Sequence, residues 1–151
     1  ADPTAVGDSS GEWIELYNGD SATINLKGWR LKDNGSDDHV ISADVLVAPG
    51  QYVVLGNNAN TSSNGGVTMA YSYGTNWHLA NGGDEVLLYD TQNNLIDQVE
   101  YTSAWYTSGA SISLKVLGSD NNVQANWCSE TTPWKTGSDK GTPGTAAGCG
   151  S

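Results

Sequence analysis

The side chains that could catalyse a reaction are few in this chain. It has two histidines, His39 and His78. Neither comes with a serine in a Gly-x-Ser-x-Gly turn, the arrangement that exposes a nucleophilic serine in many hydrolases. Glu12 and Glu15 face opposite sides of one expected strand, so they cannot form the paired acids that glycoside hydrolysis requires. We therefore expect no catalytic residue and no enzymatic activity.

A cluster of oxygen-bearing side chains suggests metal binding instead. Asp33, Asn34, Asp37 and Asp38 gather three carboxylates and an amide on one short turn. Calcium prefers several oxygen ligands of this kind, so calcium is the one cofactor that the sequence suggests. The spacing is not that of an EF-hand loop, and Asp and Asn also favour turns for purely local reasons. Both interpretations remain open at this point.

The two cysteines, Cys128 and Cys149, lie in the last quarter of the chain. A structural zinc site needs more Cys or His ligands, and a thiol nucleophile needs a basic partner. We expect a disulfide between them, which would stabilise the fold by about 3 kcal/mol. Such a bond implies an oxidising compartment, so we expect an extracellular or cell-surface location.

The aromatic side chains suggest a binding surface. The chain has six Trp, seven Tyr and no Phe. Four of these residues lie in or beside polar loops: Trp77, Trp105, Tyr106 and Trp134. Loop Trp and Tyr can stack on sugar rings or anchor a protein interface, so we predict a surface for polysaccharide or protein. The alternative is that they cap the ends of the fold.

Charge excludes one class of partner. Seventeen acidic and six basic residues give a net charge of −11. Nucleic-acid affinity depends mostly on Lys and Arg that neutralise phosphates, so we expect no nucleic-acid binding. No apolar run is long enough for a transmembrane helix.

Hydrophobic patterning predicts an all-β fold with almost no α-helix. Residues 112–116 and 67–73 alternate apolar and polar side chains, as half-buried strands do. Residues 52–55 and 86–89 are apolar on both faces, so we expect these two strands to be central. No linker divides the chain, and we expect one domain over residues 1–151 in which residues 126–151 form an irregular tail pinned by the disulfide.

Five sequence blocks resemble the bacterial lamin tail domain family. They are residues 11–18 with 26–33, then 48–55, 79–90, 96–101 and 141–144. The resemblance implies an immunoglobulin-like β-sandwich of the kind found as an accessory module in secreted bacterial proteins. It also implies that Trp13 and Trp29 pack in the core. A fold of this kind does not by itself identify the biochemical role.

One departure from the family bears on function. Similar domains begin with a hydrophobic strand directly before the Asp-Pro that is Asp2-Pro3 here, whereas this sequence opens at Ala1. A sandwich without that strand exposes an apolar groove and unpaired backbone groups, which can accept a strand from another chain. The alternative is that processing or cloning set the boundary of the sequence.

These observations favour a non-catalytic secreted structural module. The leading hypothesis is assembly with copies of itself, or with another secreted chain, into a filament or matrix by strand donation. The alternatives are a carbohydrate-binding or adhesion module, and an accessory domain of a larger secreted hydrolase or nuclease.

Overall fold

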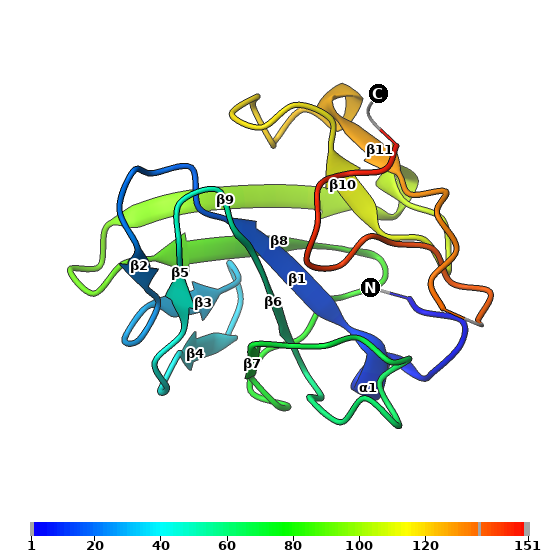
Figure 1. The fold of residues 1–151 in the computed structure, drawn as a ribbon, viewed down its shortest axis with the longest axis horizontal. Helices are drawn as coiled ribbons and strands as arrows, with labels where there is room; N and C mark the ends of the chain where they lie inside the picture. The colour runs from blue at the N-terminus through cyan, green and yellow to red at the C-terminus, as the bar shows by residue number, and fades with distance from the viewer. Residues whose placement is uncertain (1, 136, 150–151) are drawn as a thin grey trace.

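The computed structural model describes residues 2–135 and 137–149, and almost all of its regular structure is β-strand (Figure 1). The helical elements are three short turns: α1 (Asp8–Gly11), η1 (Ser103–Trp105) and η2 (Gln124–Asn126). The strands are β1 (Trp13–Tyr17), β2 (Ile24–Asn25), β3 (Arg30–Lys32), β4 (Asp38–Val40), β5 (Leu46–Val47), β6 (Tyr52–Gly56), β7 (Tyr71–Ser72), β8 (Gly83–Tyr89), β9 (Leu95–Thr102), β10 (Ile112–Leu114) and β11 (Trp127–Ser129).

The strands form two main layers. One sheet has the antiparallel order β4-β3-β8-β9, and the other has the order β1-β6-β7, in which β6 and β7 are parallel. Two short pairs, β2-β5 and β10-β11, complete the fold. In Figure 1, β1 and β6 cross in front of β8 and β9. The expectation that residues 52–55 and 86–89 form central strands is confirmed, because β6 and β8 each have a neighbour on both sides.

The core lies between the two sheets. Its largest fully buried side chains include Trp77, Tyr73, Leu31, Ile41 and Leu55. The Trp77 ring meets the Tyr73 ring edge to face at 5.1 Å between centroids, a geometry that aromatic pairs prefer. The prediction that Trp77 belongs to a binding surface is therefore wrong.

Two local expectations also need correction. Residues 67–73 form a strand only at β7, because the segment before it is held as a loop by the buried Asn64 side chain, which hydrogen-bonds the backbone of Gly66 and Val67. The tail expected to be irregular contains β11, which pairs with β10 from Ile112 to Leu114.

The segment before α1 forms no strand over residues 2–7. It is tied instead to the C-terminal part of the chain. Gly109 donates its N–H to the Asp2 carbonyl at 2.9 Å, and the Asp139 carboxylate accepts the backbone N–H groups of Thr4 and Ala5. This segment therefore does not occupy a strand position beside β1.

Candidate functional site

A large groove lies along β1 and reaches buried residues between the two sheets. Its volume is ≈ 1090 Å³, and residues of β1, β8, β9 and β10 line it together with residues 139–143, 146 and 147. Most of the lining is apolar. Four large hydrophobic residues of the lining are exposed by 39% to 65%: Tyr17, Ile96, Val116 and Leu117. Exposed apolar side chains that line one concave site are a feature of binding surfaces.

The edge of β1 beside this groove carries unpaired backbone groups. Among the described residues, β1 is paired only with β6. Asn57 donates to the Glu12 carbonyl and Asn18 donates to the Gln51 carbonyl, so the even-numbered residues bond to the β6 side. Because an antiparallel ladder alternates, the N–H and C=O groups of Trp13, Glu15 and Tyr17 point toward the open edge. Such an edge is a template for strand addition.

The other candidate edge, on β9, is protected by a side chain. Asn122 accepts the Glu100 N–H at 3.1 Å and donates to the Gln98 carbonyl at 3.3 Å. Its amide therefore occupies the hydrogen-bonding groups that a docking strand would use. A side chain that covers an edge in this way prevents unwanted pairing. Sequence analysis missed Asn122, and its only signal was a position in an Asp/Asn-rich turn.

The C-terminal segment 141–148, here called the strap, forms one wall of the groove. It packs beside β1, where Gly144 donates its N–H to the Glu15 carboxylate. Glu130, which is only 1% exposed, holds the rest of the strap by accepting the Thr142 hydroxyl at 3.2 Å and the Gly148 N–H at 3.0 Å. Sequence analysis missed this role of Glu130. The available signal was an acidic residue two positions after Cys128.

A disulfide between Cys128 and Cys149 closes the strap, as expected. The bond joins the end of the strap to β11, with 5.9 Å between the two Cα atoms. The strap is therefore fixed by a covalent bond and by two carboxylates. Disulfides of this kind persist in oxidising compartments, which is compatible with an extracellular location.

Glu15 is the one charged residue of β1. Burial in the groove raises its pKa to about 7, and the nearby charge of Glu130 contributes, although the Gly144 N–H acts in the opposite direction. Its cross-strand neighbour on β6 is Val54, which is uncharged and buried. The groove thus holds a carboxylate without a countercharge on β6.

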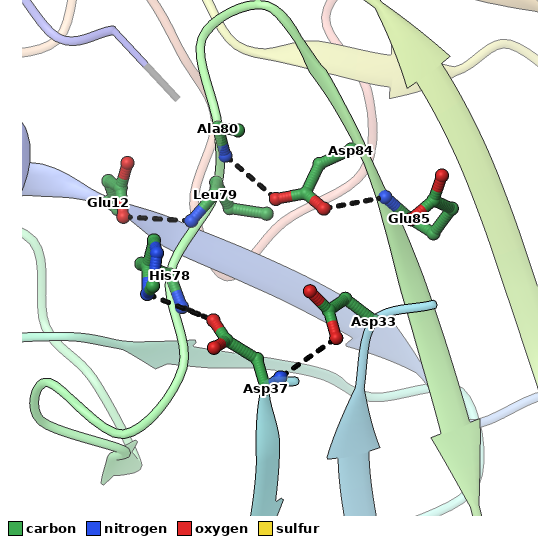
Figure 2. A network of polar contacts seen from close by, with 8 residues as sticks. All are labelled: Glu12, Asp33, Asp37, His78, Leu79, Ala80, Asp84 and Glu85. Atoms are coloured by element: carbon green, nitrogen blue, oxygen red, sulfur yellow. Dashed lines mark hydrogen bonds and ion pairs between the residues drawn. The ribbon is translucent and has the colours of Figure 1, made fainter. Parts of the chain in front are cut away.

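The predicted calcium turn does not bring its ligands together. Figure 2 shows that Asp33 accepts the Asp37 N–H, at 2.9 Å, while the Asp37 carboxylate pairs with the His78 ring at 2.9 Å. Asp38 belongs to β4 and pairs with Arg30 and Lys32 of β3. Arg30 lowers the pKa of Asp38 by hydrogen bonding and charge.

Asn34, the fourth predicted ligand, donates its backbone N–H to Glu85 at 3.4 Å. In the described parts of the chain, no three His, Cys, Asp or Glu side chains are grouped as metal ligands. The carboxylates of this turn accept hydrogen bonds or pair with basic side chains within the fold, and calcium binding at this turn stays a prediction.

Two other acids in Figure 2, Glu12 and Asp84, form hydrogen bonds with the loop that leads into β8. Glu12, 3% exposed, accepts the Leu79 N–H at 3.1 Å, and Asp84 accepts the Ala80 N–H at 2.7 Å. Desolvation raises the pKa of both carboxyls. These interactions position the loop so that Trp77 can enter the core.

The remaining predicted aromatics form no flat platform. Trp105 lies 6.4 Å from Trp127, with their ring planes inclined by 47°. Tyr106 donates its hydroxyl to the Asn81 carbonyl, and Trp134 donates its indole N–H to Gly65 at 2.9 Å. All three side chains are only partly exposed. This arrangement fits capping of the fold better than stacking on a chain of sugars.

The histidines also serve structural contacts. His39 lies 2.8 Å from the Tyr71 hydroxyl, which also accepts the Ser42 N–H at 3.2 Å. The contact ties β4 of one sheet to β7 of the other. Burial lowers the pKa of His39.

Comparison with known proteins identifies the family. The Lamin Tail Domain family matches residues 1–103, which end where η1 begins. The block at residues 141–144, the β10-β11 pair and the strap lie beyond the match. No curated protein matches the chain, and no helix in the part of the chain that the structure describes could span a membrane. The matched region carries both main sheets of an all-β immunoglobulin-like sandwich, and the family is a non-catalytic module. The chain belongs to the Lamin Tail Domain family.

Proposed function

We propose that this protein is a non-catalytic extracellular assembly module whose groove accepts an extended apolar segment of another polypeptide chain. The observation that carries the proposal is the open edge of β1 beside the groove. Backbone hydrogen bonds to Trp13, Glu15 and Tyr17 would supply affinity, and the apolar walls would receive alternate side chains.

The dimensions fit a short strand. β1 has five residues, which span about 17 Å at roughly 3.3 Å per residue. An incoming segment of about that length would cover the exposed side chains of Tyr17 and Ile96 and extend the β1-β6-β7 sheet by one strand. If the donor is another copy, the contact is head-to-tail and propagates into a filament. If it is a different secreted chain, the product is a complex of fixed size.

The experiment blocks the edge without disturbing the β1-β6 ladder. Tyr17→Pro removes an N–H that points toward the open edge, and Pro is tolerated on edge strands. Tyr17→Thr is the matched control, because it removes the same ring and keeps the N–H. Binding of a β-branched peptide of about nine residues is measured by calorimetry. We expect Tyr17→Pro to bind about tenfold more weakly than Tyr17→Thr, since it loses a backbone hydrogen bond and gains a steric clash.

Equal binding by the two variants would contradict strand addition at β1. Light scattering of native material then identifies the donor: a polymer indicates copies of this chain, and a complex of fixed size indicates a different chain.

A further inference from the structure

Glu15 occupies an unusual position for a charged residue. It lies at the middle of β1, on the edge that faces the groove, and its carboxylate accepts one described hydrogen bond, from the Gly144 N–H. An ionised carboxylate can accept about four hydrogen bonds. Desolvating it without a cation is costly.

Among the ion pairs of the described residues, none involves Glu15. The charged residues that line the groove on other elements are Asp20, Asp97, Lys115, Asp139 and Lys140. Within residues 2–135 and 137–149, none of them forms an ion pair with Glu15. The ionisable group whose charge affects it is Glu130, a second carboxylate. The charge that acts on Glu15 is therefore that of a second carboxylate.

A basic side chain on a docked strand could pair with the Glu15 carboxylate. In an antiparallel pair, the residue directly opposite another has its Cβ atom about 5 Å away on the same face of the sheet. On the β6 side this place is taken by Val54. On the open side it is the place of the incoming residue opposite Glu15. The net charge of −11 would further attract a segment of opposite charge.

We propose that the segment accepted by the groove is apolar with one Lys or Arg at its centre, and that this residue pairs with Glu15. This inference rests on the proposed function, since it concerns the partner of the same groove. It assigns a register to the docked strand, because only one alignment places the basic residue opposite Glu15. The apolar walls provide affinity and the carboxylate selects the partner.

The test uses three peptides of about nine residues that differ only at the central position, which is Lys, Gln or Glu. Each is titrated into the whole protein at pH 8. We expect the Lys peptide to bind about tenfold more tightly than the Gln peptide, and the Glu peptide to bind most weakly. In Glu15→Gln the advantage of Lys should disappear. Glu100→Gln, which removes a charge from β9 outside the groove lining, should keep it.

A second measurement needs no variant. On the unmodified protein, the preference for Lys over Gln should be smaller at pH 5 than at pH 8, because Glu15 is then largely protonated. If all three peptides bind equally at pH 8, the inference about charge is wrong and the strand-accepting groove stands. If none binds, the proposed function itself is wrong. A Lys preference that persists in Glu15→Gln would assign the selectivity to another carboxylate and overturn the inference.

Discussion

At the scale of single residues, several acidic side chains of this protein accept hydrogen bonds from the backbone and so hold loops in place. Glu12, Asp84 and Glu130 accept backbone N–H groups of Leu79, Ala80 and Gly148. In the acid-rich turn at residues 33–38, the carboxylates likewise accept an N–H group or pair with basic side chains. Composition reveals the supply of oxygen atoms, whereas the direction of each carboxylate depends on which N–H lies near it after folding.

Glu15 gives a prediction about stability and pH. Its folded pKa of about 7 lies above its ordinary value of 4.5. The folded state therefore retains a proton that the unfolded chain releases, and stability from this group is full below pH 4.5 and is lost as pH rises through 7. We expect Glu15→Gln to raise the free energy of unfolding by about 1–2 kcal/mol at pH 8, a value reduced for the partial solvent exposure of the carboxyl.

At pH 4 the two proteins should have equal stability, because both carry a neutral side chain at position 15. Urea unfolding at the two pH values provides the measurement. A variant that is less stable at pH 8 would show that the Glu15–Gly144 contact outweighs the cost of burying the charge.

At the scale of elements, the sequence predicted the parts whose pattern is local. β6 and β8 were identifiable as central strands because residues 52–55 and 86–89 are apolar on both faces. Residues 67–73 alternate as a strand does, yet the loop bonds of Asn64 prevent most of that strand. The prediction for Trp77 was wrong because its polar sequence neighbours suggested an exposed loop. In the structure Trp77 and Leu79 are buried, while His78 between them is exposed. The shape of the groove could not be predicted, because one of its walls is the strap at residues 141–148, which is far from β1 in the sequence.

The strap gives a prediction at this scale. Replacing both Cys128 and Cys149 by Ser should lower the free energy of unfolding by about 3 kcal/mol, because the unfolded chain gains the freedom of an open loop. The amide protons of Gly144 and Gly148 should exchange faster, whereas those of the β8-β9 ladder should change little. Urea unfolding and hydrogen exchange together test this. Unchanged exchange in the strap would show that Glu15 and Glu130 hold it without the covalent bond.

At the scale of the whole molecule, the two sheets form a sandwich with one open side. The β9 edge is covered by Asn122, while the β1 edge remains available beside an apolar groove. Of these two strands, only β1 therefore has an edge that could accept the strand proposed above. Under the proposed function, this edge connects the module to its partner, and the net charge of −11 opposes unspecific association.

The most direct test of this account is amide hydrogen exchange along β1, measured by nuclear magnetic resonance with and without a β-branched peptide. The even-numbered residues Ile14 and Leu16 serve as internal controls, because their N–H groups bond to β6 in both states. The account predicts that the N–H groups of Trp13, Glu15 and Tyr17 exchange rapidly in the free protein and slowly in the complex. If these three amides exchange at the same rate in both states while the peptide is bound, the partner does not add a strand to β1, and the central claim is contradicted.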